Sequence, residues 1–168
     1  RLAALLRSTP NRSDGPLVWV GCVHSETHDA GALLLSIYLR RSGYHVHYLG
    51  ENLAVEEAAV NDLIREARRH QPAMILFSAS TSPAAKKLGQ LSSRLTQSGH
   101  LPAIVGYGGP IYNRNPELRA ATAGVYIGAY AKEVVQNLDE LLAERHRAGK
   151  KDDKTKSMDR SAVQNFRR

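Results

Sequence analysis

Residues 18–50, VWVGCVHSETHDAGALLLSIYLRRSGYHVHYLG, contain a complete unit of strand, helix and strand. The run 17–23 is apolar along its whole length, as expected for a strand covered on both faces of a sheet. Residues 30–42 follow with a helical pattern, and residues 44–50 end the unit as a second strand. The apolar stripe of the helix consists of Leu33, Leu34, Ile37 and Tyr38. Such a unit is typical of a parallel sheet with crossover helices.

The rest of the chain repeats this alternation. The sequence predicts further strands at 73–80, 103–109 and 124–128, and further helices at 54–69, 84–98, 116–122 and 131–145. Two of these helices carry clear stripes, which are Val55, Ala59, Leu63 and Ala67 in the first and Val134, Leu138, Leu141 and Leu142 in the last. Because crossovers between parallel strands are right-handed, we predict a doubly wound α/β fold. Five units favour a flavodoxin-like (Rossmann-like) sheet of five parallel strands in the order 2-1-3-4-5.

Composition indicates one compact domain. The chain has 168 residues, of which 42% are hydrophobic, and this is enough for one core. Cys22 is the only cysteine, so a disulfide framework is excluded and a reducing, cytoplasmic location is expected. Cys22 and Trp19 both lie in an apolar strand and are expected in the core. No run reaches the roughly 18 apolar residues of a membrane span, and no signal peptide pattern precedes the fold.

The two ends differ from the centre of the chain. Residues 1–15 predict the end of an upstream helix followed by a linker rich in Pro, Gly and Ser, so we expect the chain to be cut from a longer protein. The domain itself is expected at 16–146 and a basic, disordered tail at 147–168. Residues 145–168 hold nine Lys or Arg against three Asp and so supply six of the seven net positive charges. Phosphate binding by this tail is the alternative, and no helix-turn-helix, zinc finger or RNP motif is present.

Three polar or small-residue segments follow strands of the predicted sheet. HSETHDAG follows the first strand, SASTSP the third and GYGGP the fourth. Because ligands bind outside the carboxyl ends of parallel strands, we expect these segments to meet at one rim. The small residues that leave a slot there are Gly31, Ser78, Ala79, Ser80, Gly106, Gly108 and Gly109.

The first of these segments carries metal-ligand chemistry. His28 is a metal ligand if its second ring nitrogen donates to the Glu26 carboxylate, which fixes the tautomer. One imidazole is too few for a zinc or iron site made by protein alone. His24 is a possible second ligand, but no third lies nearby, so a metal is expected to arrive with its own equatorial ligands. The alternative is a loop histidine hydrogen-bonded to its neighbours. His45 and His47 alternate with apolar residues and are interpreted as structural.

The combination of ETHDAG (26–31), SAS (78–80) and GG (108–109) resembles the cobalamin (vitamin B12)-binding domain, whose pattern is Asp-x-His-x-x-Gly, Ser-x-Leu and Gly-Gly. The resemblance covers about residues 16–145. It implies base-off binding of adenosylcobalamin or methylcobalamin, with His28 as the lower axial ligand of cobalt and the displaced base buried near Ser78. The implied cofactor contacts are Glu26, Thr27, His28, Asp29, Ala30, Gly31, Asn52, Leu53, Ser78, Ser80, Thr81, Tyr107, Gly108 and Gly109. For Tyr107 plain packing is the alternative.

Two positions depart from the family pattern, because Glu26 replaces aspartate and Ser80 replaces leucine. The glutamate form is similar to the B12-dependent photoreceptor repressors of the MerR family (CarH-like). This resemblance implies a light-responsive sensor domain of a transcription regulator, which reaches DNA through another domain or a partner protein and forms homo-oligomers. The upstream helical bundle that caps the cofactor in those proteins is represented here by RLAALL at most.

Two other functions remain open. The first is a corrinoid carrier domain of a methyltransferase or mutase, for which aspartate before the histidine is the usual form. The second is a flavodoxin-like protein without cobalamin. No acid-base pair, activated nucleophile or phosphate loop is recognisable in the sequence, which favours a binding or sensor domain over an enzyme.

Overall fold

The computed structural model describes residues 1–23, 29–99, 101, 103–145 and 147, and it confirms the predicted fold. Its five strands form one parallel sheet in the order β2-β1-β3-β4-β5. The strands are β1 (Leu17–Val23), β2 (His45–Leu53), β3 (Met74–Ser78), β4 (Ile104–Gly108) and β5 (Val125–Gly128). The helices are α1 (Leu2–Ser8), α2 (Ala30–Arg41), α3 (Glu57–His70), α4 (Ser82–Gln97), α5 (Ile111–Arg114) and the 3-10 turn η1 (Pro116–Arg119).

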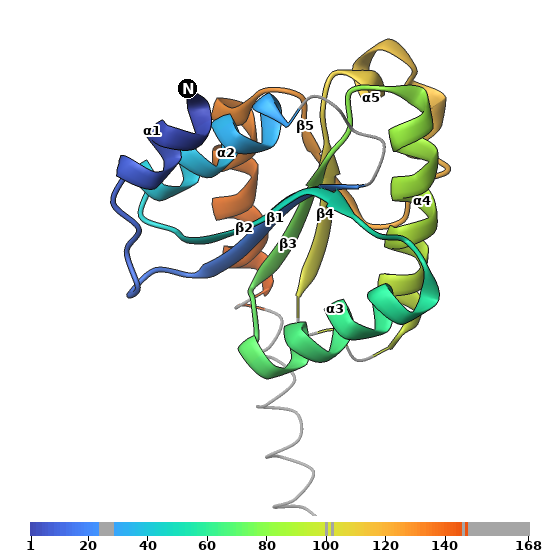
Figure 1. The fold of residues 1–168 in the computed structure, drawn as a ribbon, viewed down its shortest axis with the longest axis horizontal. Coiled ribbons are helices and arrows are strands. Elements are labelled where there is room, and N and C mark those ends of the chain that lie inside the picture. Colours follow the sequence, from blue (N-terminus) through green and yellow to red (C-terminus); the bar gives the residue numbers. More distant parts are fainter. Residues whose placement is uncertain (24–28, 100, 102, 146, 148–168) are drawn as a thin grey trace, which may run out of the picture. The chain divides into compact units, whose positions relative to one another are not determined.

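Strand β1 lies inside the sheet, between β2 and β3, and both of its faces are covered. Helices α1 and α2 lie on one side of the sheet, and α3 and α4 lie on the other (Figure 1). Trp19 and Val23 join the core under α3 and α4. Cys22 and Val20 alternate with them and are also completely buried. The predicted core positions of Trp19 and Cys22 are therefore confirmed, and burial on both faces explains why the whole strand is apolar.

Helix α2 is buried on two sides, so its predicted stripe is only half right. Leu33 and Ile37 pack against Leu6 of α1. Leu34 and Tyr38, which belong to the same predicted stripe, are 40% and 46% exposed. The side of α2 that was not predicted to be buried contains Ala32, Leu35, Ser36 and Leu39. Because α1 covers part of α2, this helix has apolar residues around most of its circumference. The sequence therefore shows no single apolar stripe that identifies the buried face.

The segment before β1 is held along the free edge of β2. The side chain of Asn11 accepts from the backbone N–H of Val46 at 2.8 Å and donates to the Val46 carbonyl at 3.0 Å. Arg40 of α2 donates to the carbonyls of Leu6 at 2.6 Å and Thr9 at 3.2 Å. The predicted linker is therefore fixed to the domain by two side chains, and Asn11 satisfies an edge-strand position that would otherwise lack a partner.

The largest differences from the predicted elements concern α5, η1 and the end of β2. The helix predicted at 116–122 is the short turn η1, and it is preceded by α5. Pro116 forces Asn115 into an extended conformation (φ −131°, ψ 78°), which separates the two turns. Strand β2 runs three residues beyond the predicted end, because a bulge at Gly50 (φ +100°) lets pairing continue to Leu53.

The chain divides into two compact units, 1–135 and 136–168. Residues 131–135 of the first unit and 136–145 of the second are helical, as predicted. Val134, Leu138 and Leu142 are buried. None of the helices in the described residues is both long and apolar enough to cross a membrane.

Candidate functional site

The carboxyl edge of the sheet is lined by small residues. Cys22 pairs with Ser78, Ser78 pairs with Gly108, and Gly108 pairs with Gly128, so four strands place one small residue each in a continuous row. This row brings the ends of β1, β3 and β4 to one rim, as the sequence predicted, whereas residues 24–28 after β1 lie outside the described residues. Short side chains in such a row leave space above the strand ends for a ligand that approaches the backbone.

Gly31 and Ser78 define the side of this space under α2. Gly31 is exposed in the first turn of α2, and a Cβ atom placed on it would lie 3.3 Å from Ser78 Oγ. Ser78 is half-buried, and its hydroxyl has no hydrogen-bond partner among the residues that the structure describes. The start of α2 and the end of β3 therefore form a cradle that any residue larger than glycine would narrow. Its floor offers a free hydroxyl, which can donate or accept.

Gly108 and Gly109 are required first by the fold. A Cβ atom on Gly108 would collide with the Gly128 carbonyl oxygen, and one on Gly109 would collide with the Ala79 carbonyl oxygen. Gly109 also has φ +114°, a backbone conformation that residues with a Cβ atom rarely adopt. The Gly109 N–H donates to Gly128 at 3.3 Å, and the Ala79 N–H donates to Gly108 at 3.0 Å. The glycine pair thus joins β3, β4 and β5 at their ends, a reason that sequence analysis did not find.

Asp29 is anchored by a tyrosine that sequence analysis missed. Asp29 precedes the first residue of α2, and its carboxylate accepts from the Tyr48 hydroxyl at 3.1 Å. Burial raises the pKa of Tyr48, and the negative charge of Asp29 raises it further, so the phenol stays a neutral donor. Tyr48 lies on the same face of β2 as the buried Val46, and this alternation was the signal that could have placed it beside α2.

The other predicted contact residues have identifiable structural roles. The Thr81 hydroxyl accepts from the Ala84 N–H at 3.3 Å and so caps α4. Tyr107 is 3% exposed, and its hydroxyl donates to the Arg119 carbonyl at 3.1 Å, which matches the packing alternative. Leu53 packs against the core, whereas Asn52 is exposed. Ser80 is half-buried and Ala30 is exposed.

Glu26, Thr27 and His28 lie outside the described residues, so the axial ligand and its carboxylate remain a prediction. Within the described part of the chain, no group of three or more His, Cys, Asp or Glu side chains could hold a metal ion.

The strand order and the small-residue rim define a flavodoxin-like α/β domain with a ligand site at the carboxyl ends of its strands. Residues 16–139 match the family model of the B12 binding domain, and the chain belongs to this family. The domain therefore binds cobalamin. The Gly31 and Ser78 cradle and the row of short side chains fit a bulky cofactor, because they leave open backbone and one free hydroxyl where a ligand must enter.

Solved structures agree in fold. A cobalamin-binding protein from Desulfitobacterium hafniense DCB-2 has a TM-score of 0.63 and 16% identity, over 76% of this chain and 59% of that one. The monomethylamine corrinoid protein of Methanosarcina barkeri has a TM-score of 0.59 and 18% identity, over 82% of this chain and 62% of that one. The methanol:cobalamin methyltransferase complex of the same organism has a TM-score of 0.61 and 21% identity, over 81% of this chain and 49% of that one. The chain thus spans about half to three fifths of these proteins. No curated protein sequence shows significant similarity to it.

Proposed function

We propose that this domain holds cobalamin base-off, with His28 as the lower axial ligand, and acts as the sensor module of a transcription regulator. The observation that carries the proposal is the cradle between Gly31 and Ser78, which lies at the start of α2, three residues after His28 in the chain. Cobalamin supplies a reactive bond between cobalt and its upper ligand, and the protein supplies binding and orientation.

The residues of the chain divide the work of binding. His28 binds the metal through one ring nitrogen. The Glu26 carboxylate accepts a hydrogen bond from the other ring nitrogen and so fixes the tautomer. Ser78 offers its free hydroxyl to the buried tail of the cofactor. The Tyr48 hydroxyl donates to the carboxylate of Asp29 at 3.1 Å and so holds in place the residue that directly follows His28. The predicted boundaries, with the domain at 16–146 and a tail at 147–168, belong to the same proposal.

A corrinoid carrier domain of a methyltransferase is the second candidate. It is favoured by the fold similarity to the monomethylamine corrinoid protein and to the methanol:cobalamin methyltransferase complex. Glu26, in place of the aspartate usual in carriers, favours the sensor. In a carrier, the partner is a methyltransferase protein; in a sensor, it is DNA, reached through another domain or protein.

The histidine is tested by mixing the purified chain with hydroxocobalamin and desalting it. The wild type should stay coloured, and His28→Ala should lose at least about tenfold in affinity, roughly 1.4 kcal/mol or more. Glu26→Gln should be milder, because an amide oxygen still accepts a hydrogen bond. His70→Ala, a histidine in the last turn of α3, is the control and should resemble the wild type. An unchanged spectrum and affinity in His28→Ala would contradict the axial assignment.

Sensor and carrier are separated by light and by methyl transfer. The chain loaded with adenosylcobalamin in the dark should change its assembly state on illumination if it is a sensor, as followed by size-exclusion chromatography. A carrier should show no such change, and its methylcobalamin form should give up the methyl group only when a methyltransferase is added. Methyl transfer that requires an added methyltransferase, together with an assembly state that does not respond to light, would favour the carrier over the sensor.

A further inference from the structure

A groove of about 530 Å³ lies between β2 and α3, beside the amino-terminal halves of β1 and β2 and away from the cofactor rim. Its volume is in the range of small-molecule sites, about 300–1,000 Å³. Four apolar side chains form its floor: Leu17, Trp19, Leu49 and Leu63. Three of them are only partly buried, although they pack against the core. The groove therefore exposes apolar surface that the described residues leave uncovered.

The orientation of α3 explains why the groove is open. The helix buries Val60, Ile64 and Ala67 in the core, whereas Leu63 of the predicted stripe only packs against the edge of the core. Leu63 is left half-buried at the border of the helix, facing the edge strand. Because β2 is the last strand on that side of the sheet, no further strand covers His45 and His47.

Aromatic rings surround the floor of the groove. The Trp19 ring centroid lies 6.0 Å from that of His47 and 6.2 Å from that of His70, with both imidazoles tilted to the indole. His47 comes from β2 and His70 from the last turn of α3, so the indole is flanked from both walls. His45 also lines the β2 wall. These rings do not form a metal site, because no set of three ligands exists in the described residues. Their π-faces suit a flat apolar group or a cation.

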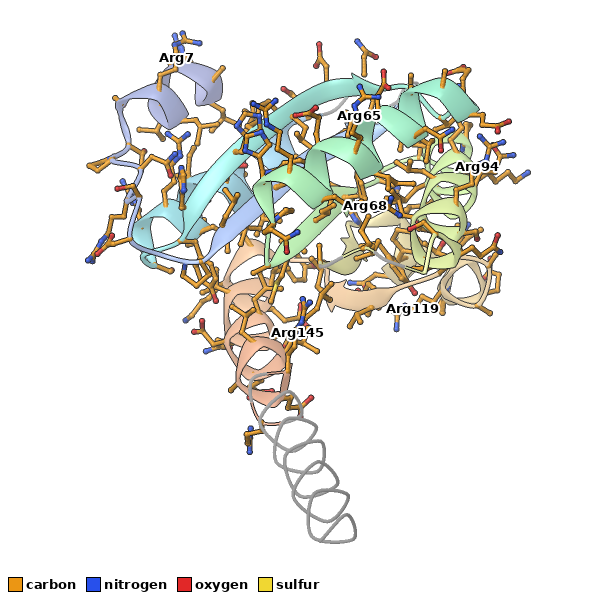
Figure 2. All side chains as sticks on the ribbon, turned by 90° about the horizontal axis from the view of Figure 1, so that it is seen from below. Arg7, Arg65, Arg68, Arg94, Arg119 and Arg145 are labelled. Carbon is orange, nitrogen blue, oxygen red and sulfur yellow. The ribbon has the colours of Figure 1, made fainter. Side chains whose placement is uncertain are left out.

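The α3 wall supplies negative charge. Asp62 and Glu66 line the groove, and Glu66 Oε2 lies 3.4 Å from His70 Nε2. Arg65 projects from α3 (Figure 2) and does not line the groove. Its guanidinium lies 2.8 Å from the Asp62 carboxylate and 3.9 Å from that of Glu66. One arginine against two carboxylates leaves one net negative charge when the three histidines are neutral. A positively charged ligand is therefore favoured over an anion.

We propose that this groove binds an organic cation, an amine or guanidinium carried on an apolar, flat body. The body lies on Leu17, Trp19 and Leu63, and the charged group meets Glu66 at the α3 wall. This site is independent of cobalamin binding.

The test uses 2-phenylethylamine as the probe and the full 168-residue chain without cobalamin. Trp19 is the only tryptophan of the sequence, so its fluorescence reports the groove directly, and calorimetry gives the affinity. The amine should bind saturably, and more tightly than 2-phenylethanol, which has no charge, or 3-phenylpropionate, which is an anion. Glu66→Gln should weaken amine binding at least about threefold. Glu57→Gln, on the same helix but outside the groove, is the matched control and should not.

Equal binding of the amine and the alcohol, tighter binding of the carboxylate, or no saturable change with any probe would overturn the proposal. So would a loss in Glu57→Gln as large as in Glu66→Gln. Sedimentation at two protein concentrations tests whether a second copy covers the groove, and dimerisation that masks Trp19 would also refute a small-molecule site.

Discussion

At the scale of single residues, the glycines of the cofactor rim have two different origins. Gly109 is fixed by backbone geometry, because it has φ +114° and touches the end of β3. Gly31 lies in the first turn of a helix, and among the described residues Ser78 is the one that limits the space beside it. The sequence pattern treats both as ligand-contact glycines. Their substitution should therefore separate stability from binding.

Gly109→Ala should destabilise the protein in the absence of any ligand. The new Cβ atom meets the Ala79 carbonyl oxygen, and the backbone must hold a conformation that costs an L-residue about 1–3 kcal/mol. Urea unfolding of the cobalamin-free chain measures the change. Gly99→Ala is a useful comparison, because Gly99 also has positive φ (+67°) but its Cβ atom would meet nothing closer than 3.9 Å. An equal loss in both variants would show that the collision at Gly109 is relieved.

Gly31→Ala should have the opposite pattern, with a gain in stability and a loss in cobalamin affinity. Alanine in place of glycine in a helix stabilises by up to about 1 kcal/mol. The same methyl group would stand 3.3 Å from Ser78 Oγ and narrow the cradle, so we expect roughly tenfold weaker binding, about 1.4 kcal/mol. Unfolding and cobalamin titrations on one preparation measure both. Unchanged affinity would mean that the cofactor does not enter beside Gly31.

At the scale of elements, the sequence predicted the parts that depend on local pattern. All five strands and their order follow from apolar runs that alternate with helical segments, and the structure confirms them. The features that were missed depend on contacts between distant segments. The burial of Leu33 and Ile37 requires α1, and the hydrogen bond from Tyr48 to Asp29 requires β2 to lie beside the start of α2. Asp29 and Tyr48 lie 19 residues apart in the chain, and Leu6 lies still farther from Leu33, so the local pattern of a single element does not relate them.

For the candidate site, too, the sequence predicted what depends on local pattern and missed what depends on contacts between distant segments. Ser78, Gly108 and Gly109 were placed at one rim from strand ends alone, and the structure confirms that placement. The reason for the glycine pair was not predictable, because it depends on the close approach of Ala79, which directly follows β3, and of Gly128 at the end of β5.

The attachment of α1 depends on Arg40, and Arg40→Met should release it. The guanidinium donates to carbonyls at the end of α1, whereas its buried Nε has no partner among the described residues. Hydrogen bonds from a charged donor contribute about 1.5–3 kcal/mol, and the unpaired Nε offsets part of this, so we expect a net loss of about 1–2 kcal/mol. Methionine keeps the length of the apolar stem.

Hydrogen exchange of two backbone amides measures this release: the Leu5 N–H donates to the Arg1 carbonyl, and the Thr9 N–H donates to the carbonyls of Leu5 and Leu6. Arg41→Met is the control, because Arg41 is exposed on the same helix. Faster exchange in Arg40→Met alone supports the role of Arg40. Equal protection in the two variants would show that the contact of Leu6 with Leu33 and Ile37 is sufficient.

At the scale of the whole molecule, the net charge of +7 is unevenly distributed along the chain. Residues 145–168 carry six of these charges, so residues 1–144 are close to neutral. The nearly neutral domain gives no electrostatic reason to bind nucleic acid by itself. Any DNA binding by this chain should therefore come from the basic segment, and cobalamin binding should not depend on it.

Deletion of residues 150–168 should separate these two properties. The predicted site residues all lie between 26 and 109, and the deleted segment offers charge with few apolar side chains. We therefore expect cobalamin affinity to change by less than about threefold, under about 1 kcal/mol. Weak DNA binding by the full chain should disappear with the deletion, and before deletion it should fall steeply with salt, because each phosphate contact releases counterions. Titrations of both chains with cobalamin, and with DNA at two salt concentrations, measure these effects. A large loss of cobalamin affinity on truncation would contradict this separation and would mean that the basic segment contributes to the cofactor site.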